Sequence, residues 1–441
     1  MGMAVVCEAA GEKQYNVQPL QPDEYYAAKT ADILLVSLYW WDNLLDFVRF
    51  LTLAGINAEK RKPVIVIGGI NACNTAILRK YFHYAILGDG EVVIAEVLRR
   101  IIAGEDAAEL DGVVSADDIG KETELLVADA IPPHTYTELR SNKIARVELA
   151  RGCQNKCPFC QLAWTKPYRE QAPEIVCHLV RQSKTKKIGL FAPNRGNYSG
   201  LPEVMNELQR QGKTNAAEDV RLDDMMKMRT ISNIKFGVEG FSERIRKKIG
   251  KVRSNEELVE GFRHIFNVLR TPTGKPVSTA TIYMIADMPG ETPEDTYEFF
   301  EVLREIDALC DRKFTLYIAV NSFIPAPFTP WEREAINPYS DFNETWRKRP
   351  RLKNIVVAER AGLKGPSVRI AQALTLRGDE RLGPVLYCLA NDGRKLIRDR
   401  SRQAGETVEK LISMTGCDPQ SVTGRIPKKD PLPHSNYKVA V

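Results

Sequence analysis

The stretch KIARVELARGCQNKCPFCQ, residues 143–161, decides how the rest of the chain is interpreted. Its first half is predicted to form a buried strand. Its second half places Cys153, Cys157 and Cys160 in the loop that leaves this strand. In α/β barrels the loops at the carboxyl ends of the strands build the active site. We therefore expect the three thiols to lie at a catalytic edge.

The C-x3-C-x2-C spacing indicates a metal cluster with an incomplete set of protein ligands. One short loop can curl around a face of an iron–sulfur cube, so these thiolates can bind it from a single segment. A [4Fe-4S] cluster normally has four cysteine ligands, and three leave one iron open to a non-protein ligand. The open iron is where we expect the chemistry.

Two other interpretations of the cysteines stay open. A structural zinc site usually pairs one C-x2-C with a second pair, and the sequence has no second C-x2-C. A redox-active pair at Cys157 and Cys160 would leave Cys153 without a role. The histidines that could complete a zinc site are scattered, at His83, His134, His178, His264 and His434.

Composition limits the class of protein. The chain has 441 residues, 44% hydrophobic and 27% charged, with a net charge of +5. This is an ordinary globular composition without a run long enough to cross a membrane. The start lacks the pattern of a secretory signal, and the odd number of cysteines, nine, argues against a disulfide framework. We expect a cytoplasmic protein with no membrane partner.

Residues 1–105 are predicted to form a small α/β domain. Three short apolar runs read as strands, at residues 31–41, 62–70 and 83–91, and helical patterns at 42–55 and 92–104 each end at a glycine. This alternation predicts a parallel sheet with flanking helices. Residues 106–142 are acidic and proline-containing, and we predict a linker there.

Residues 143–335 repeat the alternation about six times. Strands are predicted within residues 143–153, 186–194, 219–225, 233–240, 278–291 and 313–325, with helical patterns between most of them. Six units fall short of the eight in a closed barrel, so a partial, TIM-like (β/α)6 barrel is expected. Residues 336–441 are predicted to be a basic connector followed by a helical extension that begins near Pro366.

The cysteine spacing and its strand context resemble the radical S-adenosylmethionine (SAM) superfamily. Further segments resemble its B12-binding-domain branch, in the same order: residues 150–174, 192–205, 219–225, 235–251, 283–296, 323–332 and 376–386. The resemblance implies that SAM chelates the open iron. One electron then cleaves a C–S bond, and the resulting 5′-deoxyadenosyl radical abstracts hydrogen from a substrate. The donor of that electron would be an external protein such as a flavodoxin or ferredoxin.

The resemblance also implies roles for individual residues. Cys153, Cys157 and Cys160 would be the cluster ligands, and Phe159 would pack near the adenine. Further SAM contacts would come from Arg221 at the carboxylate, Asp223 beside it, Glu239 at the amino group or ribose, and the backbone of Pro289 and Gly290. Two alternatives stay open: Arg221 and Asp223 could simply pair with each other, and Pro-Gly is an ordinary turn signal.

The amino-terminal domain departs from its cobalamin-binding relatives. Ser37, Gly68 and Gly69 fit the serine strand and the Gly-Gly turn of such domains. The D-x-H-x-x-G loop with the axial histidine is missing, and the first unit is shortened. A degenerate domain without cofactor and a cobalamin-binding domain are therefore both open, and Tyr39, Trp40 and Trp41 could fill the empty site.

Three functions follow. The first is a radical SAM enzyme that attacks an unactivated C–H bond of an unknown substrate, with a nucleobase or nucleic acid as a candidate. The basic run 345–354, with Trp346 among Arg347, Lys348, Arg349, Arg351 and Lys353, could neutralise phosphates and stack a base, although such runs are usually solvated. The second is a cobalamin-dependent radical SAM C-methyltransferase. The third is a non-enzymatic metal-binding protein.

Overall fold

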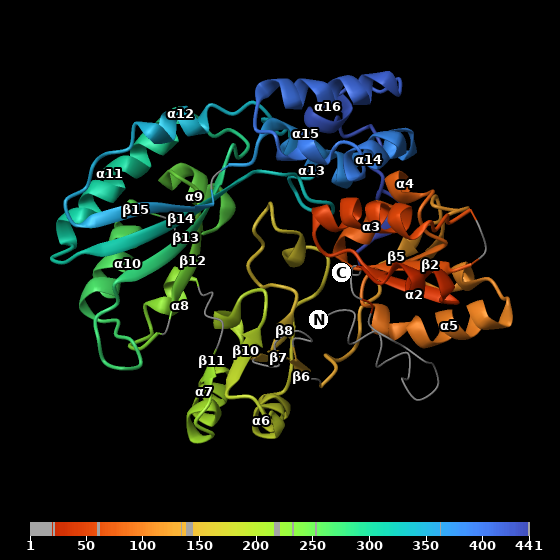
Figure 1. The fold of residues 1–441 in the computed structure, drawn as a ribbon. Helices are drawn as coiled ribbons and strands as arrows, with labels where there is room; N and C mark the ends of the chain where they lie inside the picture. The colour runs from red at the N-terminus through yellow and green to blue at the C-terminus, as the bar shows by residue number, and fades with distance from the viewer. Residues whose placement is uncertain are drawn as a thin grey trace.

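An N-terminal α/β domain, two four-stranded sheets and a set of C-terminal helices make up the computed structural model (Figure 1). It describes residues 20, 23–59, 62–133, 135–137, 144–215, 221–231, 233–251, 254–361 and 363–439. Among these residues, no helix combines the length and the apolar character needed to cross a bilayer.

The N-terminal sheet has the order β1-β2-β3-β4. The first three strands are parallel and β4 is antiparallel to β3. The three predicted strands and two predicted helices are confirmed, and the helices end at Gly55 and Gly104 as expected. The elements are α2 (Tyr25–Thr30), β1 (Ile33–Ser37), α3 (Trp41–Ala54), β2 (Val64–Gly68), α4 (Thr75–Leu78), β3 (Tyr84–Ile86), α5 (Ile94–Ala103) and β4 (Val113–Ser115).

The predicted linker is partly wrong. Val113 and Val114 are fully buried, and this apolar pair adds β4 to the edge of the N-terminal sheet. Further on, β5 (Thr123–Glu124) pairs with β16 (Tyr437–Lys438) from the end of the chain. The predictions for residues 1–19 and 138–143 lie outside the described residues, and the domain boundaries stay a prediction.

The predicted barrel strands fall into two sheets. One has the order β11-β10-β7-β6, with β7 and its parallel neighbours β10 and β11 packed against helices α6 and α7. The other is the fully parallel sheet β12-β13-β14-β15. The elements of the first are β6 (Thr135–Thr137), β7 (Ile144–Glu148), α6 (Pro173–Gln182), β10 (Lys187–Phe191), α7 (Leu201–Arg210) and β11 (Thr214–Asn215).

The second sheet differs from prediction at two points. Residues 222–225 form a helix, α8, because Leu222 and Met225 are three apart and both buried. Strand β15 lies in a segment that was predicted to be an irregular connector. The elements are α8 (Leu222–Met225), β12 (Ile234–Glu239), α9 (Glu243–Ile249), α10 (Asn255–Asn267), β13 (Thr279–Ala286), α11 (Pro293–Leu309), β14 (Phe314–Ser322), α12 (Phe342–Arg347) and β15 (Ile355–Ala361).

No hydrogen-bonded ladder joins β11 to β12 among the described residues, and residues 216–220 lie outside them. A continuous partial barrel with six units therefore stays a prediction. The α/β fold class itself is what the strands and their covering helices form.

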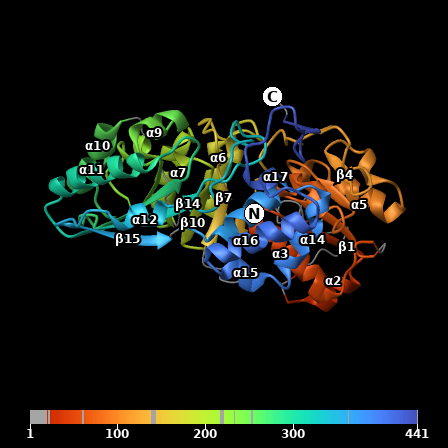
Figure 2. The ribbon, with the colours of Figure 1, turned by 90° about the horizontal axis from the view of Figure 1, so that it is seen from above.

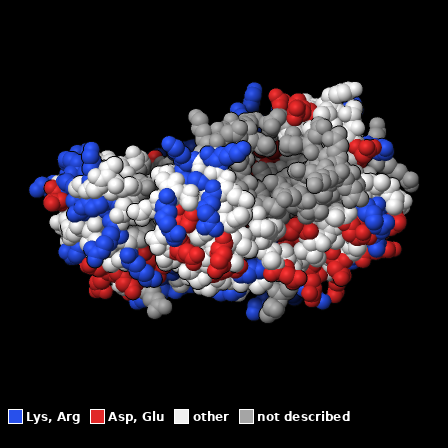
Figure 3. All heavy atoms as spheres, turned by 90° about the horizontal axis from the view of Figure 1, so that it is seen from below, with Lys and Arg blue, Asp and Glu red and all other residues white. Residues whose placement is uncertain are grey.

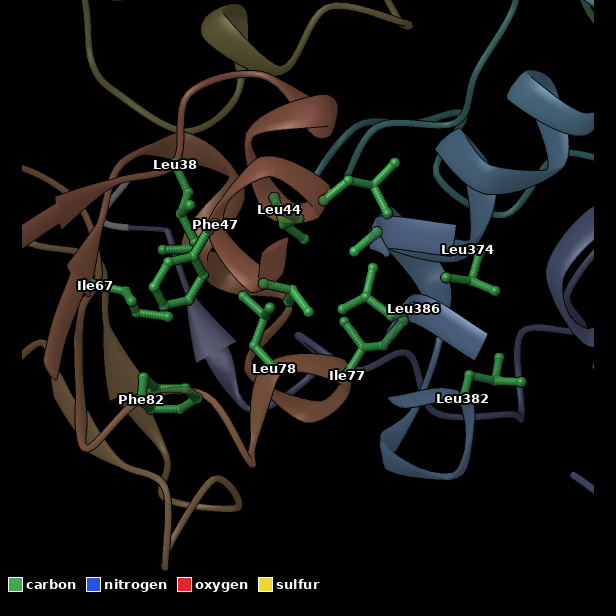
Figure 4. Packing of buried hydrophobic residues seen from close by; sticks show 14 of the residues in the cluster. Leu38, Leu44, Phe47, Ile67, Ile77, Leu78, Phe82, Leu374, Leu382 and Leu386 are labelled. Atoms are coloured by element: carbon green, nitrogen blue, oxygen red, sulfur yellow. The ribbon is translucent and has the colours of Figure 1, made fainter. Parts of the chain in front are cut away.

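The C-terminal helices pack on the N-terminal domain, as Figure 2 shows from above. Leu374 and Leu386 belong to the same buried cluster as Leu44 and Ile77, and Figure 4 shows these side chains pointing toward one another. The predicted start at Pro366 is confirmed. The helices are α13 (Pro366–Arg377), α14 (Gly383–Ala390), α15 (Arg394–Arg398), α16 (Arg402–Met414) and α17 (Gln420–Thr423).

Candidate active site

The three cysteines lie on a loop that is closed at its base. Strand β8 (Ala150–Arg151) enters the loop and pairs antiparallel with β9 (Arg169–Glu170), which leaves it. Between them, Gly152 has φ +68°, and a Cβ there would lie 2.4 Å from the carbonyl oxygen of Pro167. Only glycine allows the two ends of the loop to cross this closely. The loop is therefore a fixed platform at the carboxyl end of β7.

Hydrogen bonds inside the loop hold its shape. The Trp164 indole N–H donates to the carbonyl of Cys157 at 2.9 Å, and the Lys156 ammonium donates to the carbonyl of Ala163 at 2.8 Å. The Cys160 amide donates to the carbonyl of Cys157 at 3.1 Å. All three cysteines are free thiols, with Cys157 buried and Cys153 and Cys160 partly exposed.

Burial raises the pKa of Cys157, and the cations Lys251 and Arg221 oppose this shift. Burial likewise raises the pKa of Cys160, to which the charges of Cys157 and Cys153 contribute. Burial thus favours the neutral thiol at Cys157 and Cys160, and a bound metal cluster would compensate the charge of their thiolates. Among the described residues, no group of three His, Cys, Asp or Glu side chains converges as a site for a single metal ion.

An amide network surrounds Cys153. The Asn155 amide donates toward the Cys153 sulfur at 3.7 Å and to Asn197 Oδ1 at 3.2 Å. The Asn197 amide in turn donates to Gln154 Oε1 at 2.8 Å. Sequence analysis missed Asn155, although its place two residues after the first cysteine was the available signal.

The sequence-predicted residues Glu239 and Arg221 lie beside the cysteine loop. Glu239 ends β12 with φ +64°, at a break in the register with β13. Burial raises the pKa of its carboxyl group, and Lys251, 3.6 Å away, and Arg221 oppose the shift. Since Lys251 and Arg221 also act on Cys157, these four residues form one site. Sequence analysis missed Lys251, which reaches Glu239 only because helix α9 folds back.

Arg221 has unused hydrogen-bonding capacity. Its Nη2 donates to the carbonyl of Gly250 at 3.2 Å, whereas its Nη1 is buried and has no hydrogen-bond partner among the described residues. A buried donor without a partner is costly, so a ligand anion at this point would be favoured. Asp223, by contrast, is 69% exposed and lies 3.7 Å from Arg221. This is the simple pairing left open by the sequence.

The other sequence-predicted contacts have structural partners. Gly290 has φ +81°, and the carbonyls of Pro289 and Gly290 accept hydrogen bonds from Lys248 at 2.8 Å and Arg244 at 2.9 Å. Helix α9 thus holds this turn. Phe159 packs on a buried apolar cluster that includes Trp331.

The N-terminal domain presents the carboxyl ends of its strands to the cysteine loop. The Gln161 amide donates to the carbonyl of Ile70 at 3.3 Å and lies 3.9 Å from the Cys73 sulfur. Across the same edge, burial and then the charge of Cys160 raise the pKa of Tyr39. The predicted cobalamin-type residues lie here too, with Ser37 exposed and in register with Gly68, and with Gly69 packed on the Leu38 backbone.

This edge does not fit a corrin as it stands. The turn after β2 is in direct contact with Gln161 of the cysteine loop, and Asn71 of that turn donates to the carbonyl of Tyr39 at 2.6 Å. The two faces between which a corrin would lie therefore touch each other. We derive no step that involves cobalamin.

A buried ion-pair network joins the N-terminal domain to the cysteine loop. Asp89, only 2% exposed, pairs with Lys166 and Arg169 at the end of the cysteine loop and lies 3.3 Å from Arg151. Burial alone would raise the pKa of Asp89, but Lys166 and Arg151 hold it below its usual range. This ion-pair network fixes the edge of the N-terminal sheet against the cysteine loop.

The predicted use of Trp346 for base stacking is wrong. Its side chain is 3% exposed and packs among the rings of Phe299, Phe300 and Phe342, while its indole N–H donates to Glu359 at 3.0 Å. Arg349 is partly buried and lies over the Trp346 ring, and the exposed cations of this run are Arg347, Lys348, Arg351 and Lys353. Figure 3 shows Lys and Arg spread over the left and centre of the lower face, with Asp and Glu at its lower edge.

The part of the chain that contains this site is similar to a known family. Residues 147–303, which include the cysteine loop and Glu239, match the Radical SAM superfamily. The chain is a radical SAM protein. In this radical SAM protein, residues 8–112 also match the family described as Radical SAM proteins, N-terminal. Membership identifies the chain as an enzyme and implies a [4Fe-4S] cluster and SAM as cofactors.

Individual relatives are distant. An uncharacterised protein of Methanocaldococcus jannaschii, MJ0966, is 24% identical over 396 residues, which cover 85% of this radical SAM protein and 84% of the relative. A tRNA-2-methylthio-N(6)-dimethylallyladenosine synthase of Clostridium beijerinckii is 24% identical over 308 residues, 63% of each chain. The match thus spans less than two thirds of the synthase.

Among solved structures, the radical S-adenosylmethionine methyltransferase TsrM from Kitasatospora setae is similar in fold. That structure contains a tryptophan substrate and a SAM analogue. The TM-score is 0.50 at 13% identity, over 75% of this chain and 72% of TsrM. At this identity the likeness concerns the fold alone.

Proposed function

We propose that Cys153, Cys157 and Cys160 bind the [4Fe-4S] cluster and leave its fourth iron to SAM. When bound, the cluster supplies the electron that cleaves a C–S bond of SAM, so that a 5′-deoxyadenosyl radical removes hydrogen from an unactivated C–H bond of the substrate. The observation that carries the proposal is the closed loop with Cys157 beside Arg221, Lys251 and Glu239. An external one-electron donor such as a flavodoxin or ferredoxin completes the scheme.

The chain's own residues would bind the amino acid end of SAM by charge. Arg221 Nη1, buried and without a partner among the described residues, would donate to the carboxylate. Glu239 would accept from the amino group, and Lys251, 3.6 Å away, opposes the rise in the pKa of Glu239 that burial causes. Phe159 would exclude water on the apolar side of the loop.

A nucleobase is the proposed substrate class. Its support is the similarity to a tRNA-modifying synthase, which covers 63% of this chain. The position attacked and the group transferred are left outside the proposal.

The test compares Cys157→Ser with Cys388→Ser after anaerobic reconstitution. The Cys388 thiol is partly exposed on α14, and no cluster role is proposed for it. We expect Cys157→Ser to lose the iron chromophore and to lower reductive SAM cleavage by more than about 100-fold. The loop offers three cysteine ligands, and the substitution would leave the cluster with two of them. Cys388→Ser should match the parent chain in iron content and cleavage.

Metal analysis decides against the alternatives. Uptake of one zinc and no iron by the parent chain would identify a structural zinc protein. Intact SAM after treatment of an iron-loaded chain with strong reductant would contradict the proposed reaction.

Cobalamin binding separates the second function, a radical SAM C-methyltransferase, from the first. Because Gln161 contacts the turn after β2, we expect the purified chain to retain far less than one equivalent of cobalamin when reconstituted with it. The corrin absorption bands, measured after gel filtration, check this. Retention of one equivalent would favour the methyltransferase and would require the two edges to separate.

A further inference from the structure

A pocket of about 410 Å³ lies between the start of α3 and the C-terminal helices α13–α15. Its volume is in the range of small-molecule sites. It is separate from the cysteine loop, none of whose residues line it. The pocket combines an apolar floor with a rim of charges, and neither feature has a part in the function proposed above.

Two chain segments place four cations on the rim. Arg394 and Arg398 are four residues apart on α15 and so share one face of that helix. Lys364 and Arg400 are brought together by Gly365, where a Cβ would lie 2.7 Å from the Arg400 Cα. This close approach, held by a hydrogen bond from Ser367 Oγ to the carbonyl of Asp399 at 3.0 Å, makes the cation cluster a built feature.

The rim is positive overall. Asp42 and Asp46 are the two carboxylates that line the pocket, against four cations, so two positive charges are in excess. Arg394 lies 3.8 Å from Asp46. The remaining cations form no ion pair with any residue that the structure describes. They are available to an anion.

Part of the pocket lining, here called its floor, is apolar. Trp41 at the start of α3 contributes its indole, and Val368 and Ile397 contribute aliphatic side chains. An aromatic ring stacks on a base, while guanidinium groups bind phosphate oxygens by paired hydrogen bonds. Asp42 and Asp46, four apart on α3, can accept from ribose hydroxyl or base amino groups.

We propose that this pocket binds a nucleotide, with the base against Trp41 and the phosphate among Arg398, Arg400 and Lys364. The proposal goes beyond the cluster chemistry, because binding here needs neither iron nor SAM. The same chemistry serves a free nucleotide or one unit of an RNA strand. Phosphate contacts of this kind position a strand without reading its sequence.

The experiment measures binding to the full chain over a range of salt concentrations. The probes are adenosine, adenosine 5′-monophosphate and a short single-stranded RNA, with a glutamate oligopeptide as an acidic control ligand. The double variant Arg398→Glu with Arg400→Glu is compared with Arg347→Glu with Lys348→Glu. The latter pair consists of exposed cations at the end of α12. Circular dichroism confirms that both variants fold.

We expect the monophosphate to bind at least about tenfold more tightly than adenosine, and the pocket variant to lose that advantage. For RNA, the slope of log K against log salt should fall by at least about 1.4 in the pocket variant, since two phosphate contacts are lost. The control variant should stay within about twofold of the parent chain. If RNA binds more tightly than the monophosphate, the ligand of the pocket is an RNA strand. If the two bind equally, the ligand is a free nucleotide.

Three results would overturn the proposal. They are no binding of either phosphate-containing probe, equal weakening by the control variant, and equal competition by the glutamate peptide. Reductive SAM cleavage is measured separately on the same preparations, so failure of the pocket and failure of the cluster chemistry are told apart.

Discussion

Asn155 is the residue through which the protein is best placed to tune the proposed cluster. Its amide points at the Cys153 sulfur, 3.7 Å away, and is itself oriented by Asn197. Hydrogen bonds to the sulfurs are one of the main determinants of a cluster's reduction potential. In the proposed site, the loop would therefore influence the reduction potential of the cluster as well as bind it.

Replacing Asn155 with Leu should make the cluster harder to reduce. The donor to sulfur is lost while the branched shape of the side chain is kept, so we expect the midpoint potential to fall by some tens of millivolts. Gln154→Leu is the matched control, because Gln154 bonds Asn197 and not a sulfur. A redox titration followed by electron paramagnetic resonance measures both. Equal shifts in the two variants would contradict a direct effect on the sulfur.

At this scale the sequence predicts what is local. Cys153, Cys157 and Cys160 are close along the chain, so their grouping could be inferred from spacing. Lys251 could not be assigned to the site, because its contact with Glu239 depends on how α9 returns toward β12. The exposure of Asp223 could likewise not be predicted, since the residues of α8 were predicted to form a strand.

Among the elements, the turn between β13 and α11 contains an unusual buried acid. Burial, with Asp287 and Asp295 nearby, raises the pKa of Glu291 to about 8. Its Oε2 accepts the Met288 amide at 2.8 Å, while its Oε1 is buried without a hydrogen-bond partner among the described residues. The Glu291 carboxyl group thus loses its proton at a higher pH in the folded chain than in the unfolded chain.

This proton makes stability depend on pH. Since the folded state binds the proton more tightly, the free energy of unfolding should fall as pH rises from about 4.3 toward 8. Glu291→Gln keeps the acceptor and removes the titration, so its stability relative to the parent should rise by about 4 kcal/mol between pH 5 and pH 9. Urea unfolding at both values measures this.

The control for this prediction is Glu305→Gln, on the exposed side of α11. It should leave the difference between the two pH values unchanged. If the difference in free energy of unfolding between the parent chain and Glu291→Gln were the same at pH 9 as at pH 5, this result would contradict the proposed protonation.

Elements with a clear apolar period were predicted correctly, and the errors have physical causes. Strand β15 was missed because basic residues precede it and it lacks a clear pattern of burial, with Ile355 3% and Val356 56% exposed. The segment becomes a strand through its pairing with β14. Helix α8 was taken for a strand because four residues are too few for either period to be read. The strand order within each sheet depends on pairing between segments far apart in the chain, which local sequence does not specify.

For the whole molecule, the position of the N-terminal sheet over the cysteine loop rests on Asp89. Its carboxylate is shared by three cations from the loop and its base, and it also accepts the Ala128 amide at 3.1 Å. Removing one member of such a buried group leaves the others without compensation.

Asp89→Ala should therefore lower the free energy of unfolding by about 3 kcal/mol, because the partly buried Lys166 and Arg169 lose this partner. Arg151 keeps its ion pair with Glu148 at 2.9 Å. Glu96→Ala, which removes an exposed partner of Arg99, is the control and should leave the urea midpoint nearly unchanged. If both variants shift the midpoint equally, Asp89 does not join the two regions.

The packing of the C-terminal helices on the N-terminal sheet also constrains how the chain is made. The surface of α3 that Leu374 and Leu386 cover is apolar, and α3 is synthesised long before the helices that cover it. The first domain must therefore wait, partly uncovered, until α13 and α14 have been translated. Chaperone occupancy on nascent chains of this protein should accordingly persist until α14 has left the exit tunnel.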